Sequence, residues 1–355
     1  MKLAVSTLGL PPFNHSYLLP QLRALGVDGL EIAPDHTWKR ARYSNKFPFQ
    51  SVWNYRRVAD DAGLDIIGLH AVLGGRLELG LFEDKEHRDH TVAHLVHLSA
   101  VCRDLGGKTL TLDTRWRATL PVKEAWFACR DFFEILLPQI EEHGTTLCFA
   151  PLPENEGDFC LTARECYTLS LALDHPSFAI SLDSAPLAMG GETGHTHFVA
   201  AQRLLKIFHI DEPEKAPIGS SGQVDHGDMR QHLVAIGYDG WISIVQRFMK
   251  DTVAVDELAR SVRYVEDRYL RADVRSAISP VEATRIKIIS DTIAALRPNI
   301  QADGGDLELI SVNGNRIEVK LHGKCRACGL VGQTLGGLRR RLVSVLNSPI
   351  VVVPV

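Results

Sequence analysis

The sequence predicts an α/β protein: a parallel (β/α)8 TIM barrel over residues 1–270, a linker over 271–279 and a small α+β domain over 280–355. Three observations support this organisation. Short apolar runs alternate with amphipathic stretches through the first part. A glycine recurs between a helical stretch and the next apolar run. A polar segment then precedes Pro280 and a different pattern of elements.

Eight apolar runs of strand length lie in the first 270 residues, and longer amphipathic segments, such as 52–62, 91–105 and 122–143, lie between them. Alternation of this kind is typical of parallel sheets covered by helices. The expected strands are 3–8, 30–33, 66–71, 109–113, 146–150, 178–183, 206–210 and 241–246.

Glycines mark the expected helix ends. They are Gly26, Gly63, Gly106, Gly144 and Gly237. Glycine readily takes the left-handed conformation that closes a helix, so the recurrence indicates repeated helix-to-strand turns. A doubly wound open sheet is the rival fold. No Gly-rich phosphate-binding turn follows the first strand, so the barrel is favoured.

The last 75 or so residues predict a separate small domain. A helix is expected at 281–296, strands at 307–312 and 317–321, a helix at 330–346 and a strand at 350–353, after a final barrel helix at 253–269. Asn313 and Gly314 between the first two strands are a strong hairpin signal.

Composition restricts the function classes. The net charge of −4 gives no sign of a nucleic-acid binder, although ten Lys/Arg against six Asp/Glu make residues from 279 onward locally basic. We expect no membrane span, because no apolar run is long enough, and no signal peptide, because the first apolar run stops at Pro11. Five of the seven cysteines are scattered, which favours reduced, buried thiols and a cytoplasmic protein.

Cys325 and Cys328 form a CxxC motif between an expected strand and helix. Thiolates favour zinc or iron–sulfur clusters, both of which usually take four protein ligands, so this pair is half of a site. A helix start, Lys324 and Arg326 would lower the thiol pKa. A zinc site and a thiol–disulfide redox pair are the alternatives for CxxC alone.

The surrounding motif resembles the NifU C-terminal (Nfu-type) iron–sulfur domain. The resemblance rests on LRPNIQADGGD at 296–306, the hairpin, the CxxC pair and Thr334-Leu335. It implies a [4Fe-4S] cluster bound by Cys325 and Cys328 of two protomers, a homodimer, and delivery of the cluster to client apo-proteins. Gly329 stands where the family often has proline. Gly304 and Gly305 are expected to form a tight connection.

The first 270 residues resemble the xylose-isomerase-like TIM barrels, which include sugar isomerases, sugar-phosphate epimerases and relatives of endonuclease IV. The motifs are GLEI at 29–32, GLH at 68–70, ISLD at 180–183, FHID at 208–211 and GYDGWISI at 237–244.

This second resemblance implies a divalent metal held by Glu, Asp, His and Glu at the ends of strands five to eight. Asp183 and His209 match the middle two, but Ala150 and Val245 occupy the outer positions. Those carboxylates also transfer protons in the family, so their loss removes ligands and acid/base groups together. We therefore expect no divalent metal and no isomerase or epimerase activity. The candidates to complete or line a site are His70, Asp113, Arg115, Arg117, Glu154, Glu156, His226 and the 217–228 loop.

The leading hypothesis is an iron–sulfur cluster carrier or assembly factor whose barrel is a non-catalytic adaptor. The second is an active metal-dependent sugar isomerase or epimerase, using His70, Asp183 and His209, with an iron- or redox-sensing tail. The third is thiol–disulfide exchange at the CxxC pair. A nuclease is disfavoured because the barrel is acidic.

Overall fold

The computed structural model describes residues 1–40, 46–74, 76, 78–112, 116–117, 119–249, 254–271, 280–302, 304–313, 315–323, 331–346 and 348–354. Contacts divide the chain into two compact units, Met1–Val274 and Arg275–Val355.

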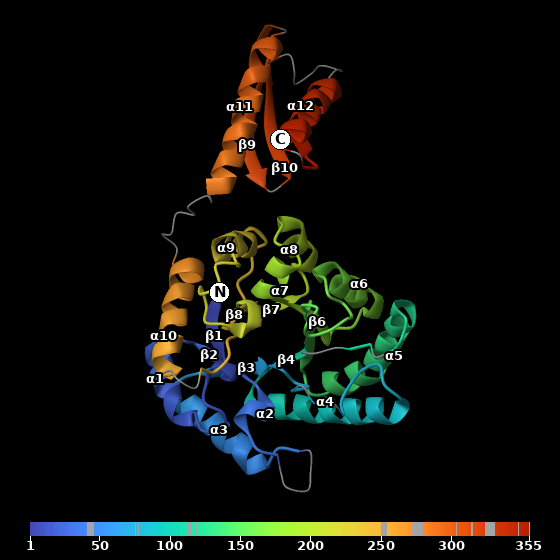
Figure 1. Ribbon diagram of the computed structural model, residues 1–355, viewed down its shortest axis with the longest axis vertical. Helices are drawn as coiled ribbons and strands as arrows, with labels where there is room; N and C mark the ends of the chain where they lie inside the picture. Colours follow the sequence, from blue (N-terminus) through green and yellow to red (C-terminus); the bar gives the residue numbers. More distant parts are fainter. Residues whose placement is uncertain are drawn as a thin grey trace. The chain divides into compact units, whose positions relative to one another are not determined.

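The first unit is a closed barrel of eight parallel strands in sequence order, which confirms the predicted fold class (Figure 1). Each strand lies within two residues of its predicted bounds. The strands are β1 Lys2–Ser6, β2 Gly29–Ile32, β3 Asp65–Leu69, β4 Thr109–Leu112, β5 Thr146–Phe149, β6 Phe178–Asp183, β7 Leu205–Ile210 and β8 Trp241–Ile244.

Helices surround this barrel (Figure 1). They are α1 Leu19–Ala24, α2 Pro34–Thr37, α3 Phe49–Ala62, α4 Lys85–Leu105, α5 Val122–Glu141, α6 Ala163–Leu173, α7 Ser184–Met189, α8 His195–Ala201, α9 His226–Ala235 and α10 Ala254–Val265, continued by a π-helical turn, η4, Glu266–Leu270. The predicted closing glycines are confirmed: Gly26, Gly63, Gly106, Gly144 and Gly237 have φ between 68° and 94°.

The interior of the barrel changes character along its axis. Near the amino ends of the strands, small and apolar side chains such as Ala4, Cys148 and Ala179 pack together. Trp241 packs against them, and a side chain on Gly29 would come within 2.9 Å of its ring. Toward the carboxyl ends the interior becomes polar, and the candidate site lies there.

The second unit has two helices and a three-stranded sheet. They are α11 Pro280–Ala302, β9 Gly305–Asn313, β10 Arg316–Gly323, α12 Val331–Leu346 and β11 Val351–Pro354. Strand β10 is central, antiparallel to β9 and parallel to β11.

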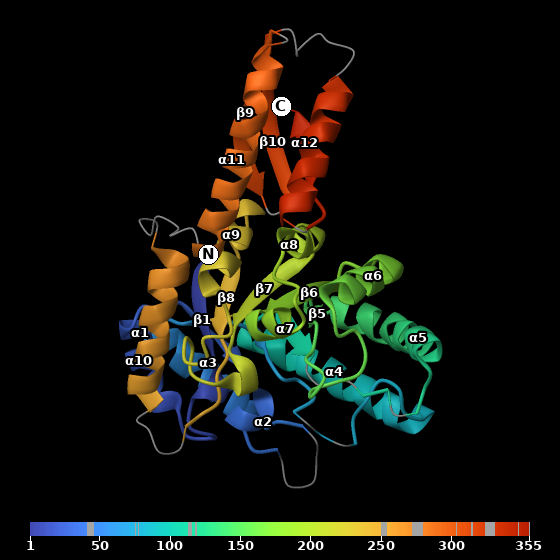
Figure 2. The same ribbon diagram turned by 45° about the horizontal axis from the view of Figure 1, so that its top comes forward.

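One apolar core joins these elements. Helices α11 and α12 contact each other and the sheet (Figure 2) through Ile289, Leu307, Val319, Leu338 and neighbouring apolar side chains. Helix α11 continues past the predicted end, across Pro298. Gly304 then turns the chain with φ 82°, and its carbonyl oxygen lies 2.5 Å from the place of a side chain on Gly323. The left-handed φ of Gly304 supports the tight connection expected at this point, and the close approach explains why Gly323 has no side chain.

No helix in the described ranges combines the length and apolarity needed to cross a membrane.

Candidate functional site

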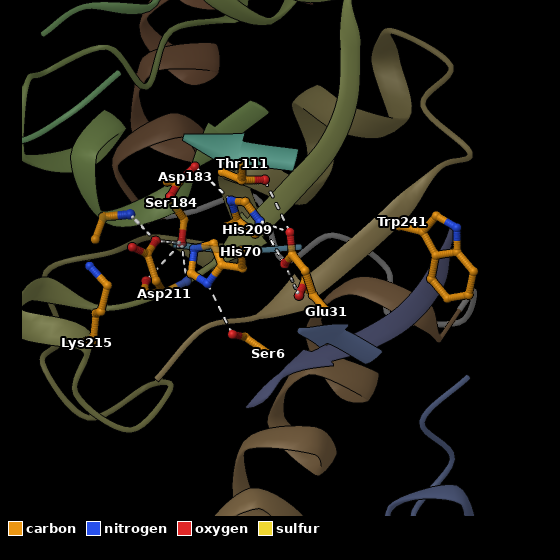
Figure 3. Close-up of polar contacts among 12 residues, drawn as sticks. Ser6, Glu31, His70, Thr111, Asp183, Ser184, His209, Asp211, Lys215 and Trp241 are labelled. Carbon is orange, nitrogen blue, oxygen red and sulfur yellow. Dashed lines mark hydrogen bonds and ion pairs between the residues drawn. The ribbon is translucent and has the colours of Figure 1, made fainter. Parts of the chain in front are cut away.

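A buried ion network lies at the carboxyl end of the barrel (Figure 3). His209 of β7 is adjacent in register to Asp183 of β6. Its Nδ1 lies 2.9 Å from Asp183 Oδ1, and its Nε2 lies 3.0 Å from Oε2 of Glu31, which reaches across from β2. Ser243 and Thr111 donate hydrogen bonds to Glu31 at 2.9 and 3.2 Å. Five strands therefore supply polar groups that satisfy one another.

Electrostatics within this network favour the charged forms. Burial opposes ionisation of Glu31, but the charge and hydrogen bond of His209 outweigh it and lower the pKa of Glu31 to about 2. Burial likewise opposes protonation of His209, but Glu31 and Asp183 raise its pKa well above 6.5. The centre is thus an imidazolium between two carboxylates, and such a pair is costly to break in a dry interior.

His70 joins the same network from the end of β3. Its Nδ1 lies 3.1 Å from Ser6 Oγ, and its ring centroid lies 5.0 Å from that of His209. Burial lowers the pKa of His70 to about 4, so this imidazole is neutral at pH 7. The structure thus brings together all three residues predicted for the barrel: His70, Asp183 and His209.

The residues present do not fit the four-ligand metal site that the barrel fold implies. Ala150 and Val245 are apolar and 2% and 1% exposed, so neither offers a ligand. Both ring nitrogens of His209 face carboxylates. Within the described part of the chain, no three His, Cys, Asp or Glu side chains are arranged to hold a metal ion.

The residues considered as replacement ligands lie elsewhere or are otherwise engaged. Glu156 is ion-paired with Lys215 at 2.7 Å. His226 lies 3.1 Å from Glu212 and 2.9 Å from the Tyr269 hydroxyl. Glu154 is exposed. Asp113 lies outside the described residues, as does Arg115.

A cavity of about 280 Å³ lies at the barrel mouth, lined by Glu156, Asp183, Asp211 and Lys215 among others. Ser184 Oγ and the Ala185 amide donate to Asp211 Oδ1 at 3.0 and 2.8 Å. Burial, with the charge of Asp183, raises the pKa of Asp211 to about 7. Charged and hydrogen-bonding side chains therefore line this cavity.

The 217–228 loop and Arg117 have structural contacts of their own. Glu212 accepts hydrogen bonds from the Gly219 amide, Ser221 and His226, which hold the loop after β7. The Arg117 side chain donates to the carbonyl oxygens of Asp158 and Leu120.

Sequence reasoning missed Glu31 and Asp211. Both fall in quoted motifs, GLEI and FHID, but neither was given a role. A carboxylate inside an apolar strand is the signal that could have found Glu31, because a buried charge needs a partner.

The predicted thiol ligands, Cys325 and Cys328, lie outside the described residues. Strand β10 ends at Gly323 and α12 begins at Val331, so the seven residues that contain them connect a strand end to a helix start. Cys102, Cys129, Cys148, Cys160 and Cys166 are buried, as predicted. Burial raises the pKa of Cys102 to about 12.

Fold and site together define a two-part protein, a parallel eight-stranded barrel and a small α+β domain. Residues 19–267 match the family described as xylose isomerase-like TIM barrel, and residues 289–353 match the NifU-like domain. The chain belongs to the xylose isomerase-like TIM barrel family and carries a NifU-like domain.

Curated relatives match the small domain. An uncharacterised 10.3 kDa protein from the vnfA 5′ region of Azotobacter vinelandii is 47% identical over 73 residues, 21% of this chain and 76% of that protein. Nitrogen fixation protein NifU of Cereibacter sphaeroides is 43% identical over 77 residues, 22% of this chain. NifU of Azotobacter chroococcum mcd 1 is 46% identical over 71 residues, 20% of this chain. The chain spans only 30% and 23% of those two NifU proteins.

Solved structures match the barrel. A D-psicose 3-epimerase has a TM-score of 0.63 at 15% identity, covering 76% of this chain and 99% of its own. A 3-keto-D-glucoside 4-epimerase from E. coli has a TM-score of 0.59 at 16% identity, covering 74% and 99%. At this identity the likeness concerns the fold alone.

Proposed function

We propose that this protein is an iron–sulfur cluster carrier. Thiolates of Cys325 and Cys328 from two protomers bind one [4Fe-4S] cluster, and the homodimer delivers it to client apo-proteins in the reducing cytoplasm. In delivery, each bond from iron to a carrier sulfur breaks as a client thiolate binds that iron. The proton lost by the client thiol passes to the departing carrier thiolate, and no electron moves.

The NifU-like domain is the observation that carries this proposal. Ligand count supports the shared cluster, because the chain contains one CxxC motif and a [4Fe-4S] cluster takes four thiolates. The other five cysteines are buried, and burial raises the thiol pKa of Cys102 and Cys148. A second copy of the same domain is the simplest source of the missing ligands.

The barrel acts as a non-catalytic adaptor in this proposal. Ala150 and Val245 provide no carboxylate, and His209 faces Glu31 and Asp183. The mouth cavity gives the adaptor a place to hold a small ligand. The likeness to sugar epimerases keeps a metal-dependent epimerase as the second candidate. A divalent metal ion that co-purifies with the chain and is lost in Asp183→Asn would favour that candidate.

Anaerobic reconstitution with iron and sulfide tests the carrier. We expect about four iron and four sulfide per dimer, following the ligand count, together with dimer mass by light scattering. Cys325→Ala and Cys328→Ala should lose the cluster, whereas the matched control Cys148→Ala should keep it. A Cys325→Ala protein with its full cluster, or a stoichiometric zinc ion without iron, contradicts the proposal. Delivery is tested by mixing the reconstituted protein with an apo-ferredoxin. We expect the visible circular dichroism of the cluster-loaded ferredoxin to appear.

A further inference from the structure

A second cavity, of about 210 Å³, lies against helix α4 of the barrel, and we call it the α4 pocket. Lys46, Arg76, Leu79, His90, His94 and His97 line it. The three histidines recur with His87 at spacings of three and four, so they share one face of the helix. None of these residues lines the mouth cavity that contains Asp183 and Asp211.

Arg76 carries a donor that the described residues do not satisfy. Its Nε and Nη2 both bind Oε1 of Glu78. Its Nη1 is buried and has no hydrogen-bond partner among the described residues, and the side chain is 13% exposed. A buried guanidinium N–H without an acceptor costs free energy, and such groups in native proteins usually have a partner.

The hydrogen bonds of His94 and His97 set which ring nitrogen of each is protonated, and His97 adds a donor to the pocket. His94 Nε2 donates to the Val72 carbonyl oxygen at 2.9 Å. His97 Nε2 accepts from the Phe47 amide at 3.4 Å, which leaves its Nδ1 as a donor. The charged lining residues, Lys46 and Arg76 against Glu78, give a net positive charge. Donors and positive charge favour an anion and repel a metal ion.

We propose that the α4 pocket binds the carboxylate or phosphate group of a small organic anion. The Arg76 guanidinium and Lys46 supply positive charge to the anion, and the Nδ1–H of His97 supplies a hydrogen-bond donor. Guanidinium groups suit both kinds of oxyanion because several N–H donors lie in one plane. Leu79 and Ala93 supply apolar surface for the remainder of the ligand. This site is independent of cluster binding.

Isothermal titration of the full chain tests the pocket with three probes: inorganic phosphate, phenyl phosphate and benzoate. We expect saturable 1:1 binding of at least one of the two aromatic probes. Phenyl phosphate binding without benzoate binding identifies a phosphoryl ligand, and the reverse identifies a carboxylate. If inorganic phosphate binds as tightly as phenyl phosphate, the pocket recognises the oxyanion and the aromatic ring adds no affinity.

Two variants remove the site by different means. Arg76→Gln deletes the unsatisfied donor, and Ala93→Leu fills the pocket from an exposed helix position without changing charge. Each should weaken binding at least tenfold, whereas Lys123→Gln on α5 should leave it unchanged. If Arg76→Gln lowers the melting temperature, its weaker binding could come from partial unfolding, and Ala93→Leu then provides the test of the site. No saturable binding of any probe, or equal affinity in the wild type and Ala93→Leu, overturns the proposal.

Discussion

The two units treat their chemically active side chains differently. In the barrel, Glu31, Asp183 and His209 bind one another in a dry interior, and apolar Ala150 and Val245 stand where two carboxylates are expected. In the small domain, the two candidate thiols belong to a seven-residue segment between β10 and α12. The barrel cluster pairs its own charged groups, whereas the two thiols, in the function we propose, need a second molecule to complete their ligand set.

The double variant Cys325→Ala/Cys328→Ala should distinguish the two units most clearly. We expect complete loss of cluster absorbance near 400 nm after reconstitution, because no thiolate pair remains to hold iron. Barrel stability should stay unchanged. All five tryptophans precede residue 271, so their fluorescence reports barrel unfolding by itself. If the variants lose the cluster and their barrel unfolding midpoint also shifts, the two units are energetically coupled. That result would contradict the contrast drawn between them.

Glu31→Gln should produce the largest effect on the barrel. The substitution keeps the side chain's shape but leaves the buried His209 charge with one carboxylate in place of two. Breaking one partner of a buried ion pair costs about 3–5 kcal/mol. Urea unfolding followed by tryptophan fluorescence measures this loss.

The matched control is Asp89→Asn, which breaks the exposed Lys85–Asp89 pair of α4. We expect a change below about 0.5 kcal/mol, because exposed helix pairs contribute little. If Glu31→Gln and Asp89→Asn lower the free energy of unfolding by similar amounts, the barrel centre is solvated. The barrel would then not differ from the small domain in burying its charged groups.

The acid side of the barrel's stability profile supplies the next test. Burial lowers the pKa of His15 from 6.5 to about 4, although its hydrogen bond to the Pro11 carbonyl oxygen opposes this. Between those values the unfolded chain binds a proton that the folded barrel does not. Stability from His15 is therefore present above pH 6.5 and lost as pH falls toward 4, at up to about 1.4 kcal/mol per pH unit.

His15→Asn should reduce that slope, because asparagine can still donate to the Pro11 carbonyl oxygen but does not titrate. Urea midpoints of the two proteins at pH 7, 6, 5 and 4 give the comparison. Parallel profiles would mean that His15 is accessible to protons in the folded barrel.

Local sequence signals were sufficient for most of the fold. The glycines that close helices, such as Gly63 and Gly106, and the apolar runs of the strands act over a few residues, and the structure has them where they were predicted. Two helices are longer than predicted: α4 begins at Lys85 and not at residue 91, and α11 continues across Pro298, where local signals favoured an end.

The candidate site was predicted only in part, for a reason of distance along the chain. Asp183 and His209 were found because a family motif marks each one. Glu31 was not, since its partner His209 is 178 residues away and only closure of the barrel brings them together. Asp211 follows the same rule: its pKa is raised by burial and by the charge of Asp183 on the neighbouring strand, and both depend on the folded barrel. Side-chain pairing across a barrel is set by tertiary structure, which no local pattern encodes.

Tyr269→Phe should give the smallest effect and tests whether the barrel's polar groups support one another beyond its centre. The Tyr269 hydroxyl lies 2.9 Å from His226 Nδ1, and His226 Nε2 donates to Glu212, which holds the loop after β7. Loss of one buried hydrogen bond should cost about 1 kcal/mol by urea unfolding.

Tyr17→Phe is the matched control for Tyr269→Phe. It also deletes a tyrosine hydroxyl, but Tyr17 is 60% exposed, so its hydroxyl faces solvent. We expect no change in its midpoint. Limited proteolysis adds a local readout: if Glu212 holds the loop through His226, Tyr269→Phe should speed cleavage within residues 213–225 more than cleavage elsewhere. Uniformly faster cleavage would mean that the substitution lowers the stability of the whole barrel. The hydrogen bonds of Gly219 and Ser221 to Glu212 would then be enough to hold the loop.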